Sequence, residues 1–319
     1  MEKKKVLVTA TNYSRLCAAG KKLLEEHGCE IIENPFGRPM TFSELQEFAP
    51  QADAVVAGVD DWNSSIFSLT PRLKAICRFG VGVDNINLED ASKANIKVTN
   101  AAGMNANAVA ELTIGLLISA MRNIPQLYQT TQQGQWDRFV GDELINRKVG
   151  LLGFGNIARC VAKKLMGFDV DVSTYDKYPN LEAARALNVT ICDKEEILRT
   201  SDVVILLLPS LKETYHFMND DAFSMMKPGS YFINTARGAL VDEAALYRAL
   251  TSGRLSGAAI DVYEAEPTQK GNPLFTLDNV ITTPHTAAET YKTYHDIGLL
   301  TAQAILDVFN GREPKNLLN

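Results

Sequence analysis

The 319-residue chain has few cysteines and histidines and no long apolar run, and these shortages argue against several classes of protein. Its five cysteines are scattered without a CxxC pair, which disfavours a disulfide framework or a zinc site. The longest apolar stretch, LTIGLLISAM, is too short and too often interrupted to cross a bilayer. The run VLVTA after MEKKK is too short for a signal peptide. We therefore expect a cytoplasmic protein with reduced thiols, no bound metal and no membrane association.

The chain also lacks a basic stripe. Asp and Glu outnumber Lys and Arg by 38 to 32, which gives a formal net charge of −6, so we expect no nucleic-acid partner. Hydrophobic residues make up 46% of the chain and charged residues 22%, which is ordinary for a globular protein. Because a domain typically has about 100–150 residues, the length predicts two domains.

Short β-branched runs alternate with amphipathic helical windows, and this alternation predicts an α/β protein with parallel sheets wrapped by helices. A first set of such units includes a predicted helix over 14–28 and closes with NIKVTNA. After a long helix over 105–123, a second set begins with the strand KVGLLGFG. The last predicted helix, over 291–311, is expected to return to the first set.

The stretch VGLLGFGNIARCVAKKL places Gly153 and Gly155 directly after an apolar strand, at the start of a helix, with Ala158 in the third position. In the dinucleotide-binding fingerprint these positions form the tight turn, the close approach to the pyrophosphate and the helix–strand contact. Asp176 ends the next strand at the distance required for an acceptor of ribose hydroxyls. We therefore expect NAD (NADH) as cofactor, and NADP less so, although Lys177 weakens that preference.

Only four histidines occur, and one of them, His285, follows directly on the strand-like run VITTP. Arg237 and Glu266 also follow predicted strands, and ligands of open α/β sheets gather at the carboxyl ends of strands. Histidine titrates near neutral pH, so His285 suits the proton transfer that accompanies hydride transfer to a keto group. A carboxylate at Glu266 would fix its tautomer, and the fork of Arg237 matches a substrate carboxylate. The pattern predicts interconversion of a 2-hydroxy acid and its 2-keto acid.

Several long motifs resemble the D-isomer-specific 2-hydroxyacid dehydrogenase family, nearest in style to its D-3-phosphoglycerate dehydrogenase branch without a regulatory domain. They are GFGNIA with Asp176, MKPGSYFINTARGALVDEAAL, GAAIDVYEAEP, TPHTAAET, RFGVGVDNINLEDA and VTNAAGMNANAVAELTIGLL. The resemblance implies two Rossmann-like, doubly wound parallel-sheet domains with an active-site cleft between them. The substrate-binding domain would comprise 1–100 plus 291–319, and the NAD-binding domain 101–290. A homodimer is also implied, formed through the NAD-binding domain and the helix near 105–122.

The resemblance also assigns site residues. The catalytic set comprises Arg237, Glu266 and His285. The cofactor contacts comprise Gly153, Gly155, Asn156 and Ile157 at the pyrophosphate, Asp176 at the ribose, and Thr235, Ala236, Asp261 and Ala287 on the nicotinamide side. Substrate contacts comprise Val81, Gly82, Asn105 and Arg237, the first two through backbone N–H groups of a glycine-containing loop.

Departures from the family pattern leave the substrate open. Where 3-phosphoglycerate dehydrogenases carry an arginine suited to phosphate, the stretch AVVAGVDDWNSS offers Asp60 and Asp61, which would repel an anion. Arg138 could supply a cation instead, from a partner subunit. Ala287 replaces the usual glycine after the catalytic histidine, and with the sequence ending at Asn319 we expect no regulatory domain.

Three alternatives therefore remain beside a dehydrogenase for an unspecified D-2-hydroxy acid. The first is 3-phosphoglycerate dehydrogenase proper. The second is a glyoxylate/hydroxypyruvate or D-lactate type reductase. The third is a non-catalytic NAD-sensing scaffold, which the absence of any added interaction motif makes improbable. A formate dehydrogenase is disfavoured because that relative replaces the Glu–His pairing that Glu266 and His285 preserve.

Overall fold

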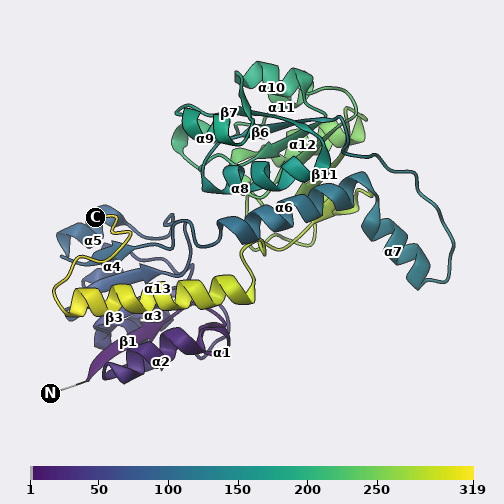
Figure 1. Cartoon of the computed structure of the whole chain (residues 1–319). Coiled ribbons are helices and arrows are strands. Elements are labelled where there is room, and N and C mark those ends of the chain that lie inside the picture. The colour runs from purple at the N-terminus through teal and green to yellow at the C-terminus, as the bar shows by residue number, and fades with distance from the viewer. Residues whose placement is uncertain (1–2) are drawn as a thin grey trace. The chain divides into compact units, whose positions relative to one another are not determined.

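A computed structural model describes residues 3–319, and the chain divides into two compact α/β units (Figure 1). The first unit is the chain up to Asn105 together with Glu289–Asn319, and the second is Ala106–Ala288. Sequence placed the boundaries at 100/101 and 290/291. The chain just after 100 stays with the first unit, where the N–H of Ala101 bonds to the carbonyl of Gly80 at 2.8 Å.

The first unit is a five-stranded parallel sheet in the order β2-β1-β3-β4-β5. Its strands are β1 (Lys4–Val8), β2 (Cys29–Glu33), β3 (Ala54–Ala57), β4 (Ala75–Arg78) and β5 (Lys97–Thr99). Its helices are α1 (Tyr13–Leu16), α2 (Ala18–Glu26), α3 (Phe42–Phe48), α4 (Ser64–Phe67), α5 (Leu88–Lys93) and α13 (Tyr291–Phe309). One face of the sheet packs on α1, α2 and α13, and the other packs on α3, α4 and α5.

Residues 14–28 do not form the single helix expected from sequence. The backbone of Cys17 leaves helical geometry (φ −115°, ψ 40°) and separates α1 from α2. Beyond this break α2 packs closely on α13, because a Cβ at Gly20 would lie 2.3 Å from the carbonyl oxygen of Gly298. The break therefore accompanies the contact between α2 and α13, which no local sequence pattern predicts.

The second unit is a seven-stranded parallel sheet in the order β12-β11-β10-β9-β6-β7-β8. Its strands are β6 (Lys148–Leu152), β7 (Asp171–Tyr175), β8 (Thr190–Ile191), β9 (Val203–Leu206), β10 (Ser230–Asn234), β11 (Leu255–Ile260) and β12 (Val280–Thr282). Its helices are α6 (Ala106–Met121), α7 (Ile124–Gln132), α8 (Asn156–Leu165), α9 (Leu181–Ala186), α10 (Lys194–Thr200), α11 (Asp220–Met225) and α12 (Glu243–Thr251). Helices α6 and α8 cover one face of the sheet, and α10, α11 and α12 cover the other.

Both units thus confirm the predicted α/β class with doubly wound parallel sheets. The central strands β3 and β9 are apolar on both faces, with all four residues of each buried, because helices cover both sides of each sheet. Within residues 3–319, none of the helices has the length and apolarity needed to cross a membrane.

Candidate active site

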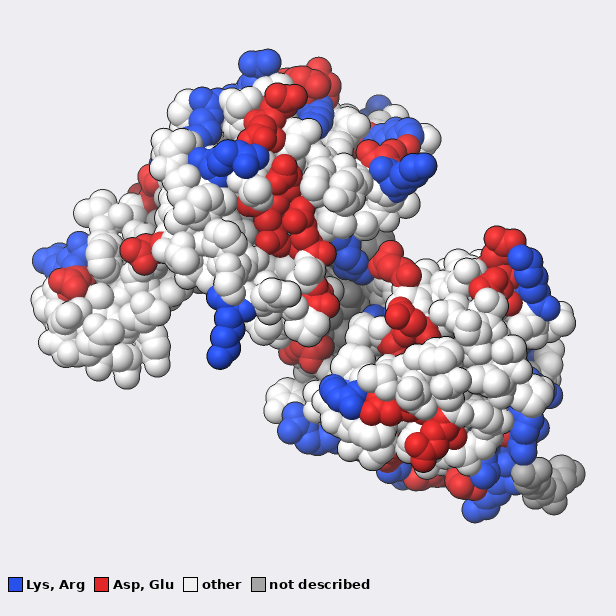
Figure 2. All heavy atoms as spheres, turned by 180° about the vertical axis from the view of Figure 1, so that it is seen from behind, with Lys and Arg blue, Asp and Glu red and all other residues white. Residues whose placement is uncertain are grey.

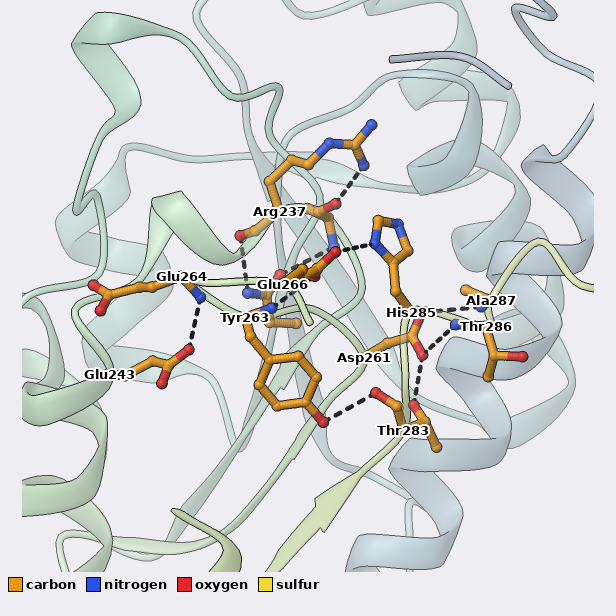
Figure 3. Close-up of polar contacts among 12 residues, drawn as sticks. Arg237, Glu243, Asp261, Tyr263, Glu264, Glu266, Thr283, His285, Thr286 and Ala287 are labelled. Atoms are coloured by element: carbon orange, nitrogen blue, oxygen red, sulfur yellow. Dashed lines mark hydrogen bonds and ion pairs between the residues drawn. The ribbon is translucent and has the colours of Figure 1, made fainter. Parts of the chain in front are cut away.

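The imidazole of His285 and the carboxylate of Glu266 form a hydrogen-bonded pair in the second unit. Nδ1 of His285 lies 2.6 Å from Oε2 of Glu266, and Figure 3 shows the ring facing the carboxylate. An ionised carboxylate only accepts hydrogen bonds, so Nδ1 carries the proton. The other ring nitrogen, Nε2, has no hydrogen-bond partner among residues 3–319, and the side chain is 46% exposed. This arrangement leaves Nε2 available for proton exchange with a bound molecule.

The carboxylate of Glu266 is held in its ionised form. Its second oxygen, Oε1, accepts the backbone N–H of Tyr263 at 2.9 Å. Burial by itself raises the pKa of Glu266, but the hydrogen bonds from His285 and Tyr263 and the charge of Arg237 outweigh it. They hold the pKa below its ordinary value. At neutral pH the pair therefore consists of a carboxylate and an oriented imidazole, the arrangement that stabilises a protonated ring.

Arg237 follows β10 and lies beside the pair (Figure 3). Its Nη1 donates to the carbonyl of Ala236 at 2.7 Å, and its own carbonyl accepts from the buried side chain of Asn234 at 3.1 Å. Its charge acts on Glu266, so the structure brings the three predicted catalytic residues together in one unit.

The loop that carries His285 is held in an uncommon conformation. His285 has φ +50°, in the left-handed region that non-glycine residues seldom occupy. Its N–H bonds to the carbonyl of Asp261 at 2.7 Å. The fully buried carboxylate of Asp261 accepts the hydroxyl of Thr283 at 2.6 Å and the N–H groups of Thr286 and Ala287, each at 2.9 Å. Asp261 thereby fixes the backbone on both sides of the histidine.

The residues predicted on the nicotinamide side lie near this loop and near the end of β10. Ala236 and Ala287 are buried, and Asp261 is 0% exposed with its carboxylate bonded within the chain. The hydroxyl of Thr235 lies 2.8 Å from that of Thr113 on α6, so this side chain joins a helix to the sheet. Their contact with a cofactor stays a prediction.

The turn between β6 and α8 has the geometry expected of a dinucleotide site. Gly153 has φ +107°, and a Cβ there would lie 2.8 Å from the backbone of Leu207, so only glycine fits. Gly155 begins α8 without any side-chain cap, and a Cβ there would meet nothing within 4 Å. The first N–H groups of α8, those of Asn156 and Ile157 included, therefore have no side-chain cap as acceptor, which suits a pyrophosphate.

Asp176 stands at the end of β7, beside this turn. Its Oδ2 accepts the N–H of Phe154 at 2.7 Å, and its Oδ1 accepts the N–H of Tyr178 at 2.8 Å. Each carboxylate oxygen keeps a second lone pair, so the group can still accept a ribose hydroxyl. The residues present therefore fit NAD.

The predicted substrate contacts lie in the first unit. Val81 and Gly82 belong to the loop after β4, and Asn105 is the last residue of the first unit before α6. No group of three or more His, Cys, Asp or Glu side chains suited to a metal ion occurs within residues 3–319.

Two features of the second unit were not found from sequence. Arg159, in the first turn of α8, donates to the side chain of Asn156 and so places a cation at the open helix end. An arginine there was a usable signal, because first turns favour acidic residues. His216 Nε2 also lies 2.6 Å from Glu264 Oε1, a second His–Glu pair. These two residues are 48 positions apart in loops, so nothing local pointed to their contact.

Comparisons with known proteins agree with this geometry. The sequence model of the D-isomer specific 2-hydroxyacid dehydrogenase, NAD binding domain, matches residues 114–287, which lie within the second unit. The D-3-phosphoglycerate dehydrogenase of Archaeoglobus fulgidus is 38% identical over 283 residues, which are 88% of this chain and 54% of that protein. The glyoxylate reductase of Thermofilum pendens is 34% identical over 308 residues, which are 94% of this chain and 91% of that protein.

A solved structure of a protein from Thermus thermophilus superposes with a TM-score of 0.91 at 32% identity, covering 99% of this chain and 100% of that chain. The protein therefore belongs to the D-isomer specific 2-hydroxyacid dehydrogenase family, and its second unit is the NAD-binding domain. It spans about half the length of the D-3-phosphoglycerate dehydrogenases that it matches and nearly the whole length of the glyoxylate reductase.

Replacing Asp261 by Asn should destabilise the second unit. In one orientation the NH₂ group of the new Asn side chain would face the N–H of Ala287. In the other it would replace the oxygen that accepts from Thr283 and Thr286. A hydrogen bond to a charged group contributes about 1.5–3 kcal/mol. Urea unfolding should show a free energy of unfolding lower by about that amount. Asp193→Asn is the matched control, because Asp193 caps α10 and Asn caps equally well. Equal stability of D261N and the parent protein would contradict the role given to Asp261.

Proposed function

We propose that the protein is an NAD-dependent oxidoreductase that interconverts a D-2-hydroxy acid and its 2-keto acid. The observation that carries the proposal is the contact between His285 and Glu266 at 2.6 Å, in the same unit as an NAD-binding domain. When bound, the nicotinamide supplies or receives the hydride. The chain has to supply the proton and to orient the acid.

His285 transfers the proton in this proposal. In reduction, protonated Nε2 gives its proton to the keto oxygen, and in oxidation neutral Nε2 takes the proton of the hydroxyl. Glu266 keeps Nδ1 protonated and offsets the positive charge of the ring. Arg237, whose guanidinium has a planar fork of donors, pairs with the substrate carboxylate and polarises the neighbouring carbonyl.

We further propose that the substrate is a small unphosphorylated acid. Asp60, which follows β3 at the position where a phosphate ligand would be expected, is 2% exposed, and its Oδ1 accepts the N–H of Met40 at 2.5 Å. The carboxyl group of Asp60 thus faces its own chain, and its exposed neighbour Asp61 is an acid rather than a cation, so these two positions offer no positive charge to a phosphate. The near-complete coverage of a glyoxylate reductase supports the same choice. The 38% identity with D-3-phosphoglycerate dehydrogenases favours 3-phosphohydroxypyruvate as the second candidate.

NAD is preferred over NADP in this proposal. Asp176 opposes a 2′-phosphate, and the neighbouring Lys177, the cation that could accept one, lies 3.1 Å from Glu213. The hydrogen bond and charge of Glu213 raise the pKa of Lys177, so its positive charge is retained but already paired. The exposed pair is weak, and it lessens rather than removes the attraction for a phosphate.

The assignment is tested by the rates of oxidation of NADH and NADPH with glyoxylate, hydroxypyruvate, pyruvate and 3-phosphohydroxypyruvate. We expect turnover with NADH and the unphosphorylated acids. His285→Ala should lower kcat by about 10²–10⁴-fold because it removes the proton donor. The dissociation constant of NADH should stay unchanged. Absence of turnover with every acid would favour a non-catalytic NAD-binding scaffold, and a fall in cofactor affinity alone would contradict the role of His285.

Replacing Glu266 by Gln should lower kcat for keto-acid reduction, by less than the roughly 10²–10⁴-fold loss expected of His285→Ala. The amide oxygen of Gln can still accept the proton on Nδ1, but the side chain no longer offsets the charge of the ring. Initial rates at saturating NADH and keto acid measure the loss. Glu264→Gln breaks the other His–Glu pair, at the same distance of 2.6 Å, and should leave kcat unchanged. Equal losses in both variants would show a general charge effect instead.

The protein is also proposed to act as a homodimer in the cytoplasm. Its five cysteines are free thiols, which suits a reducing compartment. Helix α7 has no buried residues, and the loop after it exposes Trp136 (82%) and Val140 (95%). In Figure 2 this segment, at the left, carries few charged side chains, so Trp136 and Val140 offer exposed apolar surface to a second copy without many charges to desolvate.

Sedimentation velocity should return twice the 35.0 kDa mass of one chain. Exchanging both Trp136 and Val140 for Ser should shift the protein toward the monomer, because apolar burial drives association. Tyr178→Ser is a suitable control, since this side chain is equally exposed at 82% but lies outside the segment. A monomer for the unmodified protein would overturn the proposal.

A further inference from the structure

In the loop after β4, a hydrogen bond holds the backbone carbonyl of each of the four residues from Phe79 to Gly82. Arg78 donates from Nη1 to the carbonyl of Phe79 at 2.7 Å and from Nε to that of Gly82 at 3.1 Å. The backbone N–H of Ala101 donates to the carbonyl of Gly80 at 2.8 Å. The side-chain Nδ2 of Asn100 donates to the carbonyl of Val81, also at 2.8 Å.

These carbonyl contacts determine where the N–H groups point. In a planar trans peptide the N–H lies opposite the carbonyl, so fixing one carbonyl fixes the direction of the next residue's N–H. The carbonyls of Gly80 and Val81 both face the segment 100–101, and the N–H groups of Val81 and Gly82 therefore point away from it. Within residues 3–319 neither N–H has an acceptor. The two donors are aligned for an external anion.

We infer that Asn100 is a positioning residue for recognition of the substrate carboxylate. It does not touch the substrate in this account: its amide holds the peptide between Val81 and Gly82 so that the N–H of Gly82 points outward. This inference rests on the proposed function, which supplies the carboxylate.

Asn100 is itself held in a single orientation. Its Oδ1 accepts the N–H of Ala102 at 3.2 Å, which leaves Nδ2 directed at Val81. Its carbonyl accepts the side chain of Asn316, from the segment after α13, at 3.2 Å. The first bond fixes the side-chain amide and the second fixes the backbone of Asn100, so the loop peptide meets a donor that is already in place. A flexible donor at this position would lose more conformational freedom on binding.

Arg78 supports the loop from the other side. A Cβ at Gly80, which has φ +157°, would lie 2.9 Å from Nη1 of Arg78, so the guanidinium packs directly against the loop backbone. Replacing Arg78 would remove a charge and several bonds at once. Asn100, with one amide bond to the loop, gives the sharper test.

The experiment compares the parent protein with Asn100→Ala and the isosteric Asn100→Asp, neither of which can donate to Val81. KM for the keto acids should rise about tenfold, the effect of one lost hydrogen bond, while kcat and the dissociation constant of NADH stay within about twofold. Because the carboxylate is common to all 2-keto acids, KM should rise alike for glyoxylate, pyruvate and hydroxypyruvate. Asn34→Ala is the matched control: its Nδ2 bonds to the carbonyls of Thr9 and Arg38 in the same unit, away from this loop.

Unchanged KM in both Asn100 variants, or an equal rise in Asn34→Ala, would overturn the inference. Binding of oxamate, a carboxylate that needs no turnover, to the NADH complex provides an independent reading. If the parent protein turns over none of the acids but binds oxamate, and Asn100→Ala weakens that binding about tenfold, the proposed reaction fails while the role of Asn100 holds. If the parent protein binds no oxamate and reduces no acid, both fail.

Discussion

The buried carboxylate of Asp261 is the constraint on which the arrangement of the site depends. It lies at the end of β11 and accepts three hydrogen bonds from residues 283–287, the segment that follows β12. A buried charge has a high cost unless its hydrogen bonds are complete, and here both oxygens are engaged. The left-handed backbone of His285 persists because bonds on each side of it over-determine the chain.

The other residues of the site are arranged around the backbone that Asp261 holds. The imidazole meets Glu266, which is fixed by the backbone of Tyr263, and the charge of Arg237 adds to the same electrostatic balance. All three side chains follow strands of one parallel sheet, whose carboxyl ends share one edge. The same edge carries the glycine turn after β6 and Asp176 after β7. The residues proposed for proton transfer and the turn predicted to bind the nucleotide thus share one rim of one domain.

The sequence predicted the α/β class because the alternation of strand-like and helical segments is a local signal. It also predicted the contact of His285 with Glu266, because residues that follow parallel strands meet at the same edge of the sheet. It was not sufficient for the helix over 14–28, which breaks at Cys17 where α2 must fit against Gly298. The position of Asp261 beside the nicotinamide stays a prediction, but the sequence did not indicate that its carboxylate holds the segment that carries His285. The pair of His216 and Glu264 was missed because it joins two loops through three-dimensional proximity alone.

The first unit is discontinuous in the chain. Helix α13 covers one face of its sheet together with α1 and α2. It begins about 190 residues after β5, the last strand of that sheet. During translation the second unit is complete before residues 291–309 leave the ribosome, whereas the apolar face formed by Val6, Val56 and Cys77 still lacks the part of its cover that α13 provides. A nascent chain of this protein therefore carries a partly open hydrophobic sheet until α13 has emerged, which makes its earlier half the part that needs protection from aggregation.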